Sequence, residues 1–135
     1  MERQREGRHY FSFPGGGVED FDETIIDTLK REMREEIGAE IDNERRIYEL
    51  HVGGHSKQIF FLCETTNKVL RLTGEELEKN TSVDQYKPIW VNINELSRLL
   101  IFPIEVRDWL VEDLGKGIFT NRMQDFESMD SMKNQ

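Results

Sequence analysis

A run of three glycines followed by a strongly acidic helix is the feature that most restricts how this chain folds. The glycines, at 15–17, come directly after a proline. A helix is predicted over 24–37, and Gly38 is placed to end it. At about 100° per residue, Glu32, Glu35 and Glu36 share one arc of this helix about 100° wide. An apolar stripe lies next to that arc, so packing the helix on a sheet leaves the three carboxylates at its rim.

The three glutamates repel one another, and a compensating positive charge is expected near them. Like charges at helical neighbour spacing cost a few tenths of a kcal/mol per pair, and more when they are partly buried. A hard divalent cation such as Mg²⁺ prefers carboxylate oxygens and offsets this repulsion. From these residues alone, a solvated helix face rich in Glu and Arg is the alternative interpretation.

The charge of the chain is concentrated around this helix. The 135 residues include 18 basic and 27 acidic side chains, a net charge of −9, and residues 17–39 hold eight acidic against three basic ones. The acidic excess argues against nucleic acid as a partner, since its backbone is bound by clustered Lys and Arg. Apolar runs fall far short of the ~20 residues that span a bilayer, so no membrane partner is expected. The single Cys63 and the absence of a leader predict a cytoplasmic location.

The rest of the chain alternates strand and helix patterns, which predicts an α/β fold. A single domain is expected over 1–119, followed by a polar, flexible tail at 120–135. Trp90 and Trp109 are expected in the core, and Asp22 or Glu23 near the start of the acidic helix. Strands are predicted at 9–13, 47–52, 58–64 and 87–93, and a further helix at 103–114.

The glycine turn and the acidic helix together resemble the Nudix box. That pattern is Gly, five residues, Glu, seven residues, Arg-Glu, an apolar residue, any residue, Glu-Glu, any residue, Gly and an apolar residue. The segment "FPGGGVE" also resembles the usual approach to the box. The resemblance implies a Nudix-like α/β/α sandwich with a mixed sheet. Every fixed position is matched: Gly17, Glu23, Arg31, Glu32, Met33, Glu35, Glu36, Gly38 and Ala39.

The resemblance implies hydrolysis of a nucleoside diphosphate linked to another group, by attack of water at phosphorus. Arg31 would orient the glutamates, and its i,i+4 spacing to Glu35 fits that role. Gly17, Glu23 and Gly38 would be structural. The divalent cation, Mg²⁺ or alternatively Mn²⁺, would be held by Glu32, Glu35, Glu36 and the carbonyl of Gly16.

The general base and the base-binding residues stay open at this point. Glu35 is one candidate for the general base, and Asp84, in the loop before the 87–93 strand, is another, with Glu75, Glu76 and Glu78 behind it. Among the aromatic residues that would stack on a base, Phe11 and Tyr86 are the main candidates, beside Tyr10, although each also suits a place in a sheet.

The resemblance has one departure, on the N-terminal side of the glycine turn. Nudix proteins usually place an inner strand well before this turn, whereas only 13 residues precede Pro14 here and they lack an apolar run. We therefore expect a sheet without the usual N-terminal strand, and either reduced stability or a homodimer formed across the gap.

The sequence favours one class of substrate only by excluding others. Position 54 lacks the proline that often accompanies ADP-ribose hydrolysis, and positions 55–57 lack the tyrosine typical of dinucleoside polyphosphate hydrolysis. Nucleoside triphosphates, including oxidised ones, are left as the favoured substrates. The alternative is a nucleotide-binding module of the same fold that does not turn over its ligand, and the intact box argues against it.

Overall fold

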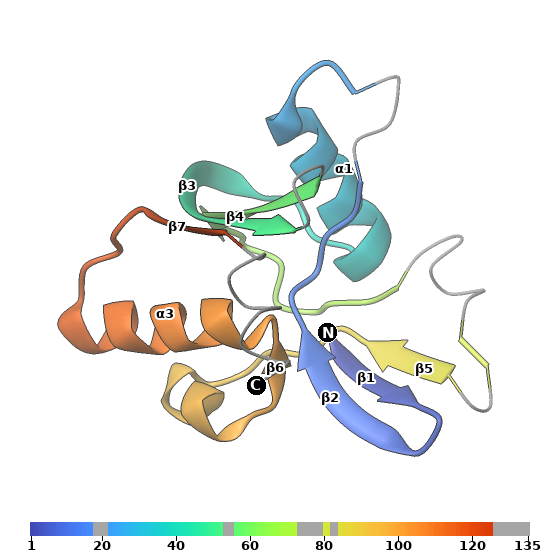
Figure 1. The fold of residues 1–135 in the computed structure, drawn as a ribbon. Helices are drawn as coiled ribbons and strands as arrows, with labels where there is room; N and C mark the ends of the chain where they lie inside the picture. The colour runs from blue at the N-terminus through green and yellow to red at the C-terminus, as the bar shows by residue number, and fades with distance from the viewer. Residues whose placement is uncertain (18–21, 53–55, 73–79, 82–83, 126–135) are drawn as a thin grey trace.

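Two small β-sheets and two helices form the framework of the computed structural model, which describes residues 1–17, 22–52, 56–72, 80–81 and 84–125 (Figure 1). Both sheets combine parallel and antiparallel pairs, so the expected α/β fold with a mixed sheet is confirmed. None of the helices in these ranges is long and apolar enough to cross a bilayer. The elements are β1 (Glu2–Arg5), β2 (Arg8–Ser12), α1 (Ile25–Ile37), β3 (Asp42–Val52), β4 (Ser56–Glu64), β5 (Asp84–Lys87), the 3₁₀ helix η1 (Ile93–Arg98), β6 (Ile101–Phe102), α3 (Ile104–Lys116) and β7 (Arg122–Asp125).

The first sheet has the strand order β5-β1-β2-β6. β1 and β2 form a tight hairpin, in which Glu6 and Gly7 take positive φ angles of 50° and 78° as a two-residue turn requires. The strand predicted at 9–13 corresponds to β2, whereas β1 lies in residues for which the sequence predicted no strand. Its residues "ERQR" are all polar, and a hydrophobic pattern therefore could not reveal it.

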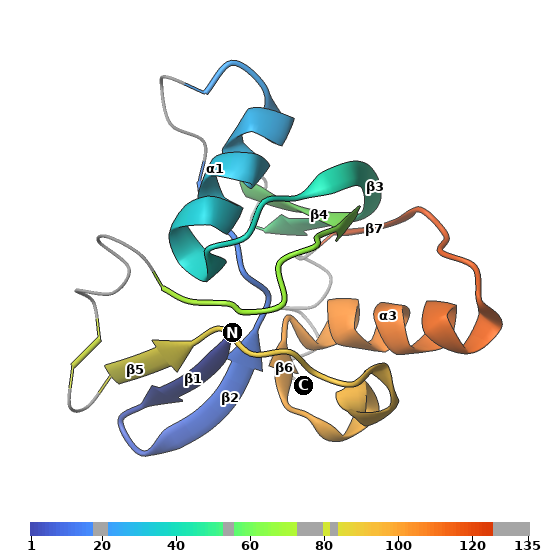
Figure 2. The same cartoon turned by 180° about the vertical axis from the view of Figure 1, so that it is seen from behind.

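The second sheet has the order β4-β3-β7 and lies between α1 on one side and α3 on the other (Figures 1 and 2). The hairpin predicted from 47–52 and 58–64 corresponds to β3 and β4, while its connecting residues 53–55 lie outside the described ranges. The α3 side of the sheet carries the main core cluster, which is formed by Ile47, Tyr48 and Val106 with Phe13, Phe60, Leu62, Trp109, Leu110 and Phe119 packed against it.

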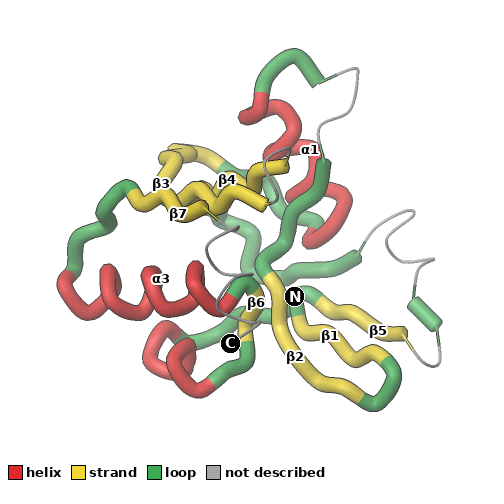
Figure 3. The backbone as a smooth tube through the Cα atoms, in the orientation of Figure 1, coloured by secondary structure: helices red, strands yellow, loops and turns green. Residues whose placement is uncertain are grey.

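The strand predicted at 87–93 is wrong in its position. β5 ends at Lys87, because Pro88 has no N–H to continue the ladder. The prediction that Trp90 lies in the core is also wrong, since 60% of it is exposed. Its indole Nε1 donates to the carbonyl of Lys68 at 2.8 Å. That carbonyl belongs to the loop 65–72, which passes between α1 and the first sheet (Figure 3).

The segment predicted as a flexible tail from residue 120 begins with an ordered strand. β7 pairs in parallel with β3, with Tyr48 opposite Arg122. Arg122 Nη2 donates to Asp113 Oδ1 of α3 at 2.9 Å, and the phenol of Tyr48 donates to the same buried carboxylate at 2.6 Å. This side-chain network and the ladder hydrogen bonds hold β7 in place, although its sequence has no apolar pattern. Residues 126–135 lie outside the described ranges.

Candidate functional site

The glycine run brings the backbone against the acidic face of α1. The N–H of Gly15 donates to Glu36 Oε2 at 2.6 Å. A Cβ atom added to Gly16 would lie 2.2 Å from Glu32 Cδ and 2.3 Å from each of its carboxylate oxygens, whereas one added to Gly17 would meet nothing within 4 Å. Only glycine therefore fits at position 16 with Glu32 in its present place.

Arg31 connects the acidic helix with the glycine turn. Its Nη1 donates to Glu32 Oε1 at 3.0 Å and to Glu35 Oε2 at 3.1 Å, and its Nη2 donates to the carbonyl of Gly17 at 2.9 Å. The side chain of Arg31 is only 16% exposed. Through these contacts Arg31 fixes two of the three candidate metal ligands relative to the turn.

Asp22 holds Arg31 in this position and was missed as a site residue by sequence reasoning. Its two carboxylate oxygens accept from Arg31 Nε at 3.1 Å and Nη2 at 2.9 Å, and it also accepts from the hydroxyl of Thr28 at 3.0 Å. The Asp22 side chain is 3% exposed, and its hydrogen bonds raise the pKa of the Arg31 guanidinium above its already high ordinary value.

The start of α1 explains why Asp22 is available for this contact. Thr24 is the N-cap, and its hydroxyl accepts from the N–H of Asp27 at 3.1 Å, so neither Asp22 nor Glu23 is needed there. Glu23, which the Nudix pattern names, is exposed. Gly38 ends the helix as predicted, with a φ of 67° that favours glycine.

The donor chemistry of this cluster fits a hard divalent cation. Glu32 is buried, and its carboxylate lies against Gly16, while Glu36 is bound to the neighbouring Gly15 N–H, so two carboxylates flank the same two glycines. Within the described ranges, no three acidic, His or Cys side chains are already arranged around one point. Glu35 is 49% exposed and accepts from the same Arg31 Nη1 as Glu32.

Asp84 lies apart from this cluster. It pairs with Arg5 in the β1–β5 ladder, with Oδ1 3.8 Å from Arg5 Nε. The Met1 end of β1 is the one near the glycine turn, because the Met1 amino group donates to the carbonyl of Ser12 at 2.8 Å. Four strand residues span about 13 Å, so Asp84 is at the far end of the strand. Glu75, Glu76 and Glu78 lie outside the described ranges.

The aromatic candidates lie on the first sheet but not on the same face. Tyr86 and Tyr10 are both opposite Arg3 in the register, whereas Phe11 is opposite Glu2. Because successive strand residues point to opposite faces of the sheet, Phe11 and Tyr86 cannot both stack on the same nucleotide base. Tyr10 is the aromatic residue of β2 that shares the face of Tyr86.

Comparison with known proteins agrees with this geometry. The chain matches the NUDIX domain family over residues 1–110, a range that contains the glycine turn and all of α1. No curated protein and no solved structure matches the chain. Enzymes of the NUDIX family are generally hydrolases that use divalent metals. The match covers most of the chain and includes the carboxylates that Arg31 and the glycines position, so the protein belongs to the NUDIX family.

Proposed function

We propose that this chain is a Mg²⁺-dependent hydrolase that cleaves the pyrophosphate linkage of a nucleoside diphosphate joined to another group. The observation that carries the proposal is the cluster in which Gly15, Gly16 and Arg31 hold Glu32 and Glu36 beside the glycine turn. Such oxygen donors suit Mg²⁺, with Mn²⁺ as a substitute. Nucleoside triphosphates remain the favoured substrates, and this choice rests on the sequence.

Each residue of the cluster has a defined part in the proposed reaction. When bound, the divalent cation screens the negative charge of the phosphates, which makes phosphorus easier for water to attack. Glu32 and Glu36 would bind the cation, with Arg31 holding the Glu32 carboxylate and the Gly15 N–H holding that of Glu36 beside the turn. Glu35, the most exposed of the three, accepts the proton of the attacking water. The new P–O bond forms as the bridging P–O bond breaks, and the leaving phosphate keeps the electron pair.

A nucleotide-binding module without turnover is the second candidate. The observation in its favour is that no three carboxylates in the described ranges are already arranged to hold a metal ion. A module of this kind would bind nucleotide and metal but release neither phosphate nor pyrophosphate.

Turnover of a nucleotide panel separates these two functions. The panel contains nucleoside triphosphates, their oxidised forms and nucleoside diphosphate conjugates, each assayed for phosphate or pyrophosphate release with and without Mg²⁺. We expect Mg²⁺-dependent hydrolysis that Glu36→Gln lowers by about 100-fold or more, because a ligand to the cation is lost. Asp27→Asn, an exposed carboxylate on the same helix, is the matched control and should keep activity. Nucleotide binding with no hydrolysis of any panel member would favour the binding module.

A further inference from the structure

A row of stacked side chains crosses the first sheet next to the proposed active site. Arg3 of β1 is directly opposite Tyr10 of β2 on one side and Tyr86 of β5 on the other, so all three lie on one face. The Arg3 guanidinium carbon is 5.8 Å from the centre of the Tyr10 ring and 5.1 Å from that of Tyr86. Phe102 of β6 continues the row with an edge contact to Tyr10, at 5.8 Å between ring centres.

Arg3 differs from the other arginines that the structure describes. Most of the other arginines contact a carboxylate or donate to a backbone carbonyl. The remaining arginines are exposed to solvent. Arg3 is half-buried, yet within the described ranges it has neither a hydrogen-bond acceptor nor an anionic partner, and its Nε is closed off from solvent. A charged donor without an acceptor is unfavourable in such a place.

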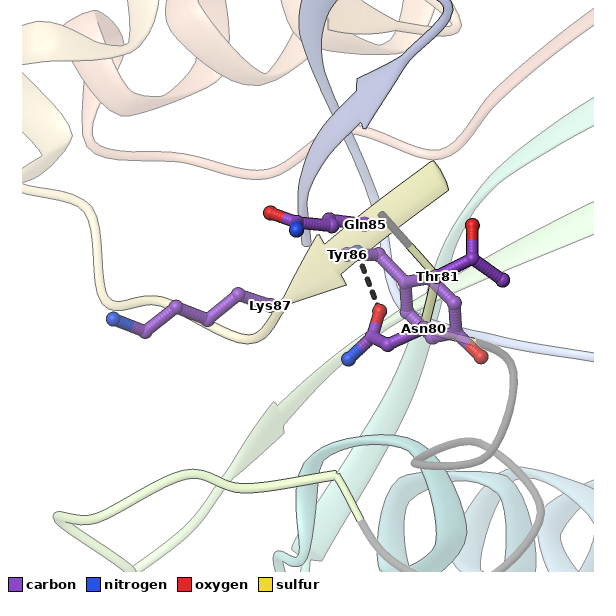
Figure 4. Close-up of a pocket in the computed structure, with 5 residues that line it drawn as sticks. All are labelled: Asn80, Thr81, Gln85, Tyr86 and Lys87. Atoms are coloured by element: carbon purple, nitrogen blue, oxygen red, sulfur yellow. Dashed lines mark hydrogen bonds between the residues drawn. The ribbon is translucent and has the colours of Figure 1, made fainter. Parts of the chain in front are cut away.

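The surroundings of Arg3 leave its positive charge available. Asp84, the acidic residue two positions along in the ladder, is close to Arg5. An open pocket of about 440 Å³ lies beside Tyr86 and is lined by Asn80, Thr81, Gln85, Tyr86 and Lys87. Figure 4 shows the Tyr86 ring beside Asn80 and Thr81, whose polar groups border the same side of β5, whereas Gln85 and Lys87 extend away from the ring.

The row is within reach of the carboxylate cluster. The Met1 amino group donates to the carbonyl of Ser12 at 2.8 Å, where β2 leads into the glycine turn. Arg3 is two residues farther along β1, a distance of about 7 Å in a strand. Arg3 therefore lies on the strand whose Met1 end contacts the residues that lead to Gly15 and Glu36.

We propose that Arg3, which lies between Tyr10 and Tyr86, binds a phosphate group of the nucleotide substrate beyond those at the carboxylate cluster. This inference rests on the proposed function and specifies its substrate class, since a third phosphate favours nucleoside triphosphates over shorter nucleotides. The guanidinium carbon lies over both tyrosine rings, and no acceptor in the described ranges takes its N–H groups, so they can donate two hydrogen bonds to a phosphate. Lysine cannot reproduce this planar arrangement.

Binding measured without turnover tests the inference. Calorimetry with Mg²⁺ and a nucleoside triphosphate whose α,β-bridge is a methylene group compares the wild-type chain with Arg3→Gln, Arg3→Lys and Arg8→Gln. Arg8→Gln is the matched control, because it removes the same charge from the same hairpin at an exposed position. We expect Arg3→Gln to weaken binding about tenfold or more, Arg3→Lys to recover part of this loss, and Arg8→Gln to change it less than about twofold. The free nucleoside should bind wild type and Arg3→Gln equally.

The outcomes separate this inference from the proposed function. Equal binding by Arg3→Gln and wild type would overturn the phosphate site, as would an equal loss in Arg8→Gln, which would indicate a general charge effect. A loss that persists with the free nucleoside would overturn it in favour of base stacking. If the wild-type chain binds the analogue through Arg3 but hydrolyses no nucleotide, the phosphate site stands and the hydrolase assignment fails. Thermal unfolding of each variant confirms that the compared proteins are folded.

Discussion

Replacing Gly16 with alanine tests the close approach of the glycine turn to Glu32. The added Cβ would lie 2.2 Å from Glu32 Cδ, whereas ordinary contacts of this kind begin at 3.4 Å, so the carboxylate must move by at least about 1.2 Å. The atom in the way is the end of a flexible side chain, and Gly16 is not among the glycines with a positive φ. The backbone therefore accepts alanine, while the Glu32 carboxylate leaves its place.

The expected losses in activity and in stability differ in size. A displacement of about 1 Å in a reacting group can cost about 100-fold in rate, which corresponds to about 2.7 kcal/mol of transition-state stabilisation. The displaced carboxylate also loses its hydrogen bond to Arg31, worth about 1.5–3 kcal/mol, while the alanine returns about 0.4–1 kcal/mol by restricting the unfolded chain. The free energy of unfolding should thus fall by about 1–2 kcal/mol, which leaves a folded enzyme with little activity.

The assay is kcat/KM as a function of Mg²⁺ concentration, with urea unfolding measured in parallel. Gly17→Ala is the matched control, because a Cβ there meets nothing within 4 Å. We expect Gly16→Ala to lose about 100-fold in kcat/KM and to need more Mg²⁺, and Gly17→Ala to stay within about threefold. Activity and Mg²⁺ dependence of Gly16→Ala near those of the wild type would refute the reasoning, and so would an equal loss in Gly17→Ala.

Three further substitutions test residues that the structure assigns differently from the sequence. Asp22→Asn should lower kcat by about 10- to 100-fold because Arg31 loses its bidentate partner, while Glu23→Gln stays within about threefold; the reverse order would contradict the assignment. Asp84→Asn should leave turnover and metal dependence within about threefold, and a large loss in steady-state kinetics would return Asp84 to the mechanism. For Asp113, burial raises the pKa, but hydrogen bonds from tyrosine and arginine side chains outweigh it and hold the pKa below the ordinary 3.8. The stabilisation that ionised Asp113 contributes is complete above pH 3.8 and is lost as pH falls through the depressed pKa. Asp113→Asn should therefore lower the free energy of unfolding in urea by about 2–3 kcal/mol at pH 7 and weaken its dependence on pH in the acid range. An unchanged pH dependence in the acid range would contradict the network.

The acidic helix could be predicted from sequence because its signals are local. The apolar stripe and Gly38 act within a few residues of the helix, and they define α1 to within one residue, although the cap is Thr24 and neither Asp22 nor Glu23. The grouping of Glu32 and Glu36 also followed from helical spacing. The partner of Arg31 could not be predicted, because Asp22 is nine positions away and helical spacing does not choose between it and the adjacent Glu23.

The strands could be predicted only where a hydrophobic face produces a pattern. β3 alternates and β4 carries an apolar run, and both were expected. By contrast, β1 is wholly polar, and β7 is held by the ion pair between Arg122 and Asp113, which are nine residues apart. The alternation at 87–93 was misleading, because Pro88 ends the strand there. Pairing between distant segments decides these elements, and local propensity does not report it.

Binding of Mn²⁺ to the chain, followed by electron paramagnetic resonance, tests most directly whether the carboxylates at the glycine turn form a metal site. The signal of free Mn²⁺ is titrated with the wild-type chain, Glu32→Gln, Glu36→Gln and the control Asp27→Asn. We expect wild type and Asp27→Asn to bind Mn²⁺ with the same affinity, and the two glutamate variants to bind about tenfold or more weakly. Equal affinity in all four proteins would place the cation elsewhere and contradict the account.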